Sequence, residues 1–285
     1  MFKIVEKEDL GNKVFGYVIK APRIAAKAEP GQFFIVRQGE GYERIPLTIA
    51  DYDREKETIT SVFQIVGAST LGLSTLGVGD EVTDMVGPLG LPSEVETLGK
   101  VVLVGGGVGI APIYPIARKL RAAGNEVISI IGARSKNLLF WEDKMREVSS
   151  RLLVATDDGS YGHKGFVTTL LEDLIKAEDI KCVWAIGPMV MMRAVANMTR
   201  PYGTKTIVSM NPIMVDGTGM CGACRVAVGG KTKFACVDGP EFDGHEVDFD
   251  LAMKRAAFFR DNEQAAMAAL ETRLEEGSCT CQKKK

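Results

Sequence analysis

One aspartate and three cysteines carry the most specific chemical signal in this sequence. Asp216, Cys221, Cys224 and Cys236 lie in a glycine-rich segment. If residue 216 were a cysteine, the spacing would be the C-x4-C-x2-C…C pattern of a plant-type [2Fe–2S] cluster. A carboxylate occupies the first ligand position instead, and the loop glycines let backbone amides approach bridging sulfides. We therefore predict a one-electron centre with these four residues as ligands.

Two alternatives to this ligand set remain open. Three cysteines and an aspartate could hold Zn²⁺ tetrahedrally, although the four-residue gap fits a ferredoxin-type loop better than a zinc knuckle. Cys279 or Cys281 could supply a fourth thiolate, but both lie in a C-x-C tail far along the chain. Cys182 opens an apolar run and is expected to pack in the core.

A glycine loop, residues 105–109, follows the apolar run at 101–104 and precedes an apolar stretch from Ile110. Glycines allow the backbone to approach a pyrophosphate at a helix N-terminus. The loop departs from G-x-G-x-x-G because Ile110 takes the sixth position. It predicts a dinucleotide site, with a tight strand–helix turn as the alternative.

The turn at Arg134, Ser135 and Lys136 follows the next predicted strand and contains no acid for a ribose 2′-hydroxyl. Its cations would suit a 2′-phosphate, so Arg134 is a candidate nucleotide contact. A solvated basic turn explains the same residues. The choice between NAD and NADP stays open.

Two segments near the N-terminus combine anion-binding and hydroxyl residues. The first runs from Arg44 to Thr48, where arginine can pair with phosphate and a hydroxyl can bond a ring heteroatom. The second, residues 63–71, joins a strand end to glycine and hydroxyl residues at an expected helix start. Either segment alone would more often have a structural role than form a binding site.

The order of elements around these segments predicts β + α/β architecture. Residues 1–96 contain short β-branched and aromatic runs between turns, which indicates an antiparallel barrel. Residues 97–210 alternate strands and helices, as in a doubly wound parallel sheet that binds a nucleotide. Residues 211–250 would form a small [2Fe–2S] domain, and residues 251–285 a C-terminal helix and tail, with one helix running from Asp248 to about Glu276.

Together the segments resemble the ferredoxin–NADP reductase superfamily. The similarity is greatest to its iron–sulfur branch, which includes the electron-transfer subunit of dihydroorotate dehydrogenase and the small subunit of NADH-dependent ferredoxin–NADP oxidoreductase. The motifs follow the family order from the barrel to about residue 250: R-x-P-x-T, G-x-S-T, G-G-G-x-G-x-x-P, T-D-D-G-S-x-G, G-P-M and the cluster segment. An aspartate at the first ligand position is a feature of that small subunit, which supports Asp216.

The resemblance assigns two sets of cofactor contacts and no catalytic side chain. Thr48 would lie near the flavin N5 edge. The FAD set is Arg44, Pro46, Leu47, Thr48, Phe63, Gln64, Ile65, Gly67, Ser69 and Thr70, of which the last three would hold the pyrophosphate. The nicotinamide-nucleotide set is Gly105, Gly106, Gly107, Val108, Gly109, Asp157, Gly187, Pro188 and Met189.

Two positions depart from the family pattern. The usual arginine lies three residues before the hydroxyl, whereas Arg44 lies four before Thr48 and Ile45 takes the usual place. The phosphate role of Arg44 is therefore less secure than the role of Thr48. Ile186 replaces a cysteine that often precedes the Gly-Pro pair, so a thiol contact to the nicotinamide is absent.

The resemblance implies hydride transfer between NAD(P)H and FAD, and single-electron transfer to the [2Fe–2S] cluster. It further implies a larger partner with another FAD and [4Fe–4S] clusters, forming a heterodimer that exchanges electrons with ferredoxin by flavin-based bifurcation. One alternative is an electron-transfer subunit of dihydroorotate dehydrogenase or of a sulfide or polysulfide reductase, although Asp216 argues against the pyrimidine branch, which usually keeps four cysteines. A zinc-stabilised, non-redox nucleotide-binding regulator is the other.

Composition agrees with a globular cytoplasmic protein. The chain is 46% hydrophobic and 25% charged, with a net charge of −2, so no nucleic-acid or anionic-membrane partner is indicated. The N-terminus lacks the apolar core of a secretory signal. The most apolar stretch, residues 101–117, is interrupted by glycines and prolines, so we expect no membrane span.

Overall fold

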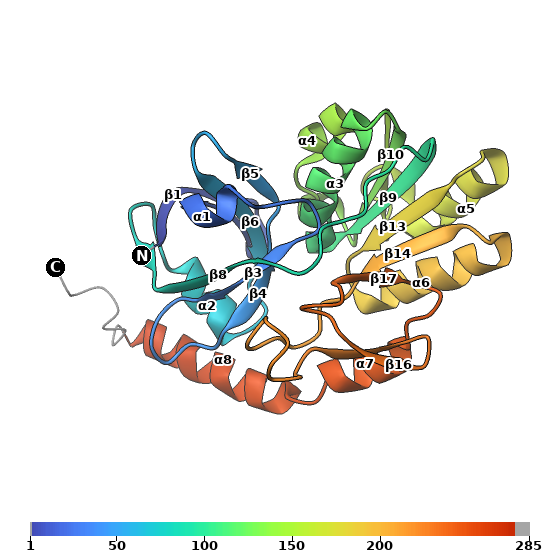
Figure 1. Cartoon of the computed structure of the whole chain (residues 1–285). Coiled ribbons are helices and arrows are strands. Elements are labelled where there is room, and N and C mark those ends of the chain that lie inside the picture. Colours follow the sequence, from blue (N-terminus) through green and yellow to red (C-terminus); the bar gives the residue numbers. More distant parts are fainter. Residues whose placement is uncertain (1, 277–285) are drawn as a thin grey trace.

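The computed structural model describes residues 2–276, in which two antiparallel sheets form the N-terminal part (Figure 1). The larger sheet has the order β5-β6-β2-β1-β7 and the smaller one β4-β3-β8. Tyr17, Phe34 and Ile59 are fully buried in the barrel core. The strands are β1 Phe2–Asp9, β2 Val14–Lys20, β3 Phe33–Arg37, β4 Ile45–Thr48, β5 Asp51–Asp53, β6 Thr58–Gln64, β7 Glu81–Val82 and β8 Asp84–Leu89, with helices α1 Pro22–Ala25 and α2 Ala68–Ser74.

The middle of the chain forms a seven-stranded sheet with the order β12-β11-β10-β9-β13-β14-β17. All neighbouring strands are parallel except β17, which pairs antiparallel with β14. The order reverses between β9 and β13, the place where a doubly wound sheet opens a ligand crevice. The elements are β9 Lys100–Gly106, α3 Ile110–Ala122, β10 Glu126–Ala133, α4 Glu142–Val148, β11 Arg151–Thr156, β12 His163–Lys164, α5 Val167–Ala177, β13 Cys182–Ile186, α6 Met189–Thr199, β14 Lys205–Ser209 and β17 Glu241–Asp243.

Helices cover both faces of this sheet because its strands are apolar on both sides. Leu103 and Trp184 face α3 and α4, whereas Val104 and Val183 face α5 and α6. Cys182 is fully buried in β13, which agrees with the predicted core packing. Burial raises the pKa of its thiol to about 12. The mixed β and α/β fold class is confirmed.

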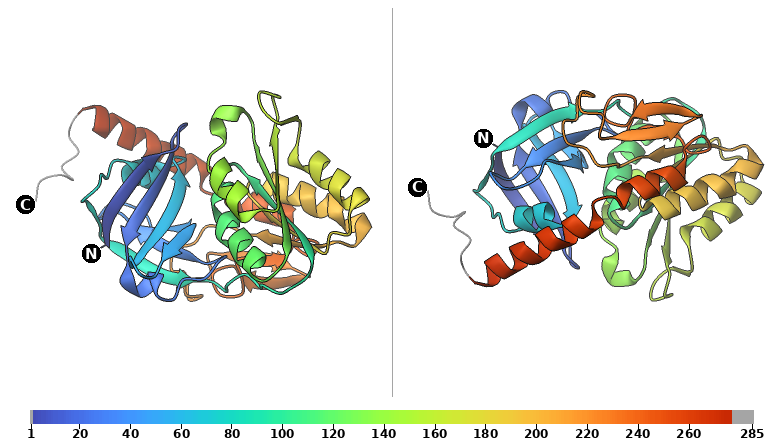
Figure 2. Two further views of the ribbon diagram at one scale, coloured as in Figure 1. Left: turned by 90° about the horizontal axis from the view of Figure 1, so that it is seen from above. Right: turned by 90° about the horizontal axis from the view of Figure 1, so that it is seen from below.

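The C-terminal part differs from the single helix expected from Asp248 onward. The structure has a hairpin, β15 Arg225–Val228 and β16 Lys231–Phe234, followed by two helices, α7 Phe249–Ala256 and α8 Arg260–Glu275. The chain turns between the helices because α7 buries Phe249 and Ala252 beside the cysteine segment, whereas α8 crosses to α2 of the barrel (Figure 2). The expectation of one continuous helix was wrong. Cys279 and Cys281 lie outside the described residues.

The barrel and the parallel sheet share a hydrophobic core. Val14, Ala50 and Val62 of the barrel pack in the same cluster as Ile110 of α3. Arg118 Nη1 on α3 also forms an ion pair with Asp51 Oδ1 at 2.8 Å. The boundaries at residues 96, 210 and 250 stay predictions, and β17 adds a strand from the cysteine segment to the nucleotide sheet. Within residues 2–276, no helix is both long and apolar enough to cross a membrane.

Candidate functional site: an iron–sulfur loop between two nucleotide-binding segments

The loop that carries the predicted cluster ligands is shaped by glycines. Gly217, Gly219 and Gly222 have φ values of 85°, 88° and 66°, a region that side chains rarely occupy. A Cβ on Gly217 would lie 2.7 Å from Leu89 Cδ1 and 2.9 Å from Ile35 Cγ1. The loop therefore lies directly against strands β3 and β8 of the barrel.

Cys221 lies where backbone N–H groups can stabilise its thiolate. Cys221 is exposed, and the N–H groups of Ala223, Asp216 and Val215 lower the pKa of its thiol. Cys224 and Cys236 are buried with their sulfurs 3.2 Å apart, and burial raises the pKa of Cys236 to about 12. Over the described part of the chain, no three His, Cys, Asp or Glu side chains are grouped around a single ion position.

Asp216 shapes the loop through its carboxylate. Its Oδ2 atom accepts hydrogen bonds from Thr218 N at 2.8 Å, Thr218 Oγ1 at 2.6 Å and Met220 N at 3.2 Å. The Thr218 hydroxyl and amide contribute most to holding the Asp216 pKa below its usual range, and the Arg44 charge contributes further. The carboxylate is thus an anion that can ligate iron. The participation of Thr218 was missed, although an Asp-x-Thr pair is a recognisable turn signal.

These features together fit a [2Fe–2S] cluster. The loop presents thiols of one exposed and two buried cysteines, an anionic carboxylate, and amides directed toward sulfur. Such amides stabilise the negative charge of thiolate and sulfide in iron–sulfur sites. The ligand assignments themselves stay predictions.

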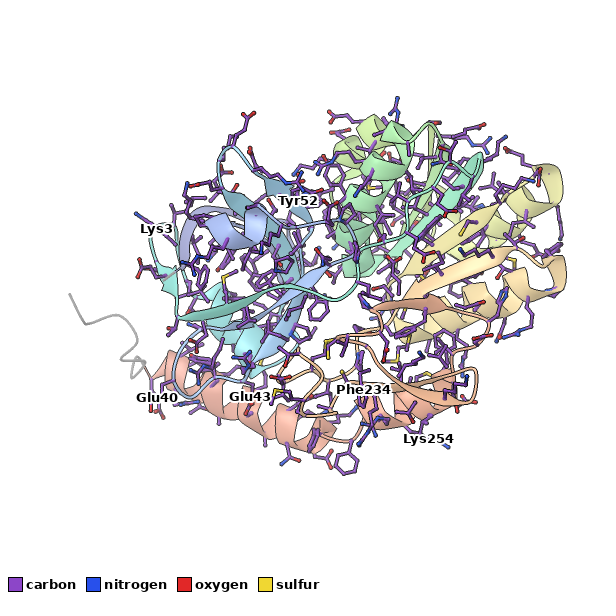
Figure 3. All side chains as sticks on the ribbon, in the orientation of Figure 1. Lys3, Glu40, Glu43, Tyr52, Phe234 and Lys254 are labelled. Carbon is purple, nitrogen blue, oxygen red and sulfur yellow. The ribbon has the colours of Figure 1, made fainter. Side chains whose placement is uncertain are left out.

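Arg44 contacts the cluster loop through its guanidinium, and its expected phosphate contact stays a prediction. Its Nε atom donates a hydrogen bond to the carbonyl oxygen of Val215 at 2.7 Å, and Nη2 donates to that of Asp216 at 3.5 Å. Arg44 immediately precedes β4, the strand that contains Leu47 and Thr48. The neighbouring Glu43 lies on the side of the barrel that faces the C-terminal segments (Figure 3). The arginine thus connects the expected flavin strand to the cluster loop.

The remaining FAD candidates form two groups. Pro46, Leu47 and Thr48 are partly exposed on β4, and Gln64 and Ile65 are partly exposed at the end of β6. Phe63 is 2% exposed and packs edge-on against Tyr17, so a flavin contact there would involve its backbone.

The start of α2 adjoins the Arg44 segment. Ser69 Oγ accepts a hydrogen bond from Glu43 N at 3.2 Å, which joins the two FAD segments. Thr70 Oγ1 accepts hydrogen bonds from the N–H groups of Val66 and Gly67 and donates to the Gly67 carbonyl. Thr70 therefore orders this turn, while a Cβ on Gly67 would meet nothing within 4 Å, leaving room for a close pyrophosphate.

The nicotinamide-nucleotide candidates meet at the carboxyl edge of the parallel sheet. Gly105 and Gly106 end β9, and residues 107–109 form a short helical turn before α3. A Cβ on Gly107 would meet no atom within 4 Å, which leaves room for a nucleotide at this position. A Cβ on Gly109 would lie only 2.0 Å from the carbonyl oxygen of Ile186. Val108 is partly exposed in this turn.

Neighbouring strand ends complete this edge. Gly187 follows β13, and Pro188 and Met189 begin α6. Asp157 is exposed after β11, and its N–H donates to the carbonyl of Ala133, next to Arg134. The Arg134 side chain is exposed. The predicted nucleotide residues are therefore brought to one edge, and their contacts with a nucleotide stay predictions.

Two protein-family models match the chain. Residues 211–248 match the iron–sulfur cluster binding domain of dihydroorotate dehydrogenase B, and residues 103–197 match the oxidoreductase NAD-binding domain. These ranges contain the cysteine loop and most of the carboxyl-edge residues. The fold and the site together define an iron–sulfur electron-transfer subunit that uses a pyridine nucleotide.

Similar proteins cover nearly the whole chain. An uncharacterised protein of Clostridium beijerinckii is 49% identical over 99% of both chains. A dihydroorotate dehydrogenase B (NAD(+)) electron-transfer subunit homologue of Thermotoga maritima is 50% identical over 92% of this chain and 93% of its own. A solved structure described for flavin-based electron bifurcation by NADH-dependent reduced ferredoxin–NADP oxidoreductase is 48% identical, with a TM-score of 0.89 over 93% of this chain and 96% of its own.

The chain belongs to the family of dihydroorotate dehydrogenase B electron-transfer subunits and their homologues, within the ferredoxin–NADP reductase superfamily. It is an oxidoreductase subunit whose cofactors are FAD, a [2Fe–2S] cluster and a pyridine nucleotide. Its homologues are electron-transfer subunits of complexes with a larger partner. The iron–sulfur domain match favours redox chemistry over the zinc-stabilised regulator.

Proposed function

We propose that this chain is the small subunit of an NADH-dependent ferredoxin–NADP oxidoreductase complex that carries out flavin-based electron bifurcation. The observation that supports this most is the contact between the Asp216 loop and the strand pair β3–β4, which carries the expected flavin residues. Similarity to the solved bifurcating oxidoreductase adds support. The larger partner would hold another FAD and [4Fe–4S] clusters and would exchange electrons with ferredoxin.

Within this function the side chains bind and position rather than transfer protons. The β4 residues and the start of α2 would hold FAD, which would supply the conversion between two-electron hydride chemistry and one-electron chemistry at the cluster. The residue 105–109 loop and Gly187 would hold the nucleotide at the carboxyl edge, with Thr48 beside the flavin. Asp216, Cys221, Cys224 and Cys236 would ligate the cluster.

The names of the curated relatives favour a second candidate, an electron-transfer subunit for dihydroorotate dehydrogenase. Asp216 in the first ligand position supports the bifurcating complex instead. Isolation of the native complex, with its subunits identified and its flavin and iron counted, separates the two. A dihydroorotate-oxidising partner would contradict the first proposal.

The function predicts ordered reduction of the isolated subunit. Purified anaerobically with its iron, the protein should contain one FAD and two irons per chain. NADH or NADPH should bleach the flavin absorbance first and then produce the EPR signal of a reduced [2Fe–2S] cluster. Comparing the two nucleotides at equal concentration gives the preference. A colourless protein that binds zinc and no flavin would contradict the proposal.

Asp216 is expected to act both as a ligand and as a turn former, and two substitutions separate these roles. Asp216→Asn keeps an oxygen for the Thr218 and Met220 amides but removes the anionic donor. We expect it to lower cluster content severalfold and change the EPR signal, and Asp216→Ala to do so more strongly. Cys279→Ser should change neither quantity.

Iron analysis and EPR of the reduced proteins check this prediction. A wild-type signal in Asp216→Asn would make Asp216 a turn residue only. Loss of the cluster in Cys279→Ser, with a wild-type signal in Asp216→Ala, would move the fourth ligand to the tail.

A further inference from the structure

We infer that Arg44 is a positioning residue that fastens the cluster loop to the flavin-binding strand and raises the reduction potential of the cluster. This inference rests on the proposed function, because it takes the Asp216 loop as the cluster site. It assigns Arg44 a role other than the phosphate contact that the sequence motif predicted, and FAD content separates the two roles.

The first argument is geometric. Both hydrogen bonds of Arg44 end on consecutive backbone carbonyls of the loop, Val215 O at 2.7 Å and Asp216 O at 3.5 Å. Immediately beyond them, Gly217 lies against Ile35 and Leu89 of the barrel. The Arg44 guanidinium thus holds the backbone at Val215 and Asp216, and close packing holds it at Gly217. The first expected ligand, Asp216, therefore lies in a fixed part of the loop.

The second argument is the place of Arg44 in the barrel. In the β3–β4 pair, Val36 lies opposite Ile45 and Phe33 opposite Thr48, so Arg44 is fixed one residue beyond the hydrogen-bonded ladder. The N–H of the preceding Glu43 reaches Ser69 at the start of α2. Residues 43 and 44 therefore link the expected FAD pyrophosphate segment to the cluster loop.

The third argument is electrostatic. A cluster held by three thiolates and a carboxylate becomes more negative when it accepts an electron. A fixed guanidinium beside that loop stabilises the reduced state more than the oxidised state.

The experiment compares three variants of the reconstituted full chain. Arg44→Met removes the charge and both donors, and Arg44→Lys keeps the charge but cannot span two carbonyls. The control is Arg54→Met, because Arg54 also joins barrel segments, donating to Ala28 O and pairing with Glu29. We measure the cluster potential by EPR-monitored redox titration, the rate of iron release to a chelator, and FAD content.

Arg44→Met should shift the cluster potential to a more negative value and release iron at least about threefold faster, as expected for the loss of a hydrogen bond. Arg44→Lys should keep most of the potential while releasing iron faster. Both variants should retain wild-type FAD content, and Arg54→Met should match wild type throughout.

Three results distinguish the possible failures. If Arg44→Met loses FAD while the cluster potential and iron release stay unchanged, Arg44 is a phosphate contact and the inference is wrong. If Arg44→Met does not fold, Arg44→Lys decides, and wild-type iron release in that variant overturns the inference. A wild-type protein that assembles no [2Fe–2S] cluster contradicts the proposed function and with it the basis of the inference.

Discussion

Replacing Gly109 with alanine is expected to destabilise the protein by about 3 kcal/mol and to abolish its reduction by NADH and NADPH. A Cβ at this position would lie 2.0 Å from the carbonyl oxygen of Ile186. That carbonyl ends β13, whose backbone is held by hydrogen bonds to β9 and β14 on either side. The clash can be relieved only by moving the start of α3, which would distort the nucleotide loop.

A matched control lies three residues earlier in the same loop. A Cβ on Gly106 would first meet Met191 Sδ at 2.3 Å, the end of a flexible side chain that can move. Gly106→Ala should therefore lose clearly less stability than Gly109→Ala. Urea denaturation measures the stability, and the rate of flavin bleaching by each nucleotide measures function. Equal stability of Gly109→Ala and wild type would contradict this prediction.

Glu241→Gln is expected to remove much of the pH dependence of folding stability between pH 4.5 and 7. The Glu241 carboxyl lies between the linker that leaves the barrel and the nucleotide sheet. Ser93 Oγ donates to its Oε1 at 2.6 Å, and Trp184 Nε1 donates to its Oε2 at 3.3 Å. Burial raises the pKa of Glu241 from 4.5 to about 7, and the nearby charge of Glu94 adds to this rise.

The sign of the effect follows from the raised pKa. The folded state binds the Glu241 proton more tightly than the unfolded state does. The contribution of protonated Glu241 to the free energy of unfolding is therefore fully present below pH 4.5 and is lost as the pH rises through about 7. The shift corresponds to at most about 3 kcal/mol. Part of this residue also borders an open pocket of ≈ 250 Å³, so the measured contribution should be smaller.

Urea unfolding at several pH values, followed by the combined fluorescence of Trp141 and Trp184, checks this prediction. Wild type should lose stability from pH 5 to pH 8, and Glu241→Gln should show a flatter dependence. Glu246→Gln, which alters an exposed glutamate in the same segment, should keep the wild-type slope. The same slope in Glu241→Gln and wild type would show that Glu241 does not titrate in this range.

Local sequence patterns were sufficient to predict the main elements and the cluster loop. Runs of β-branched and aromatic residues indicate β2 and β6, and the glycine loop between an apolar strand and helix indicates the β9–α3 crossover. The spacing of Asp216 and the three cysteines predicted an iron–sulfur loop, and the four ligand assignments stay predictions. Each of these signals lies within one short segment of the chain, because propensity, turn chemistry and ligand spacing act locally.

Contacts between distant segments could not be predicted in this way. The Arg44 motif indicated phosphate binding, but its hydrogen bonds to Val215 and Asp216 depend on how the C-terminal loop packs on the barrel. No sequence pattern singled out Glu241, whose carboxyl accepts the Ser93 hydrogen bond because β17 joins the nucleotide sheet. The division between α7 and α8 likewise follows from their different packing partners.

The spacing of Asp216 and the cysteines thus indicated which cofactor the protein binds. How the cluster loop lies against the barrel depends on contacts between residues more than 170 positions apart, such as Arg44 and Asp216. Such contacts exist only because burying apolar surface brings separate segments together, and no pattern within a single segment encodes them.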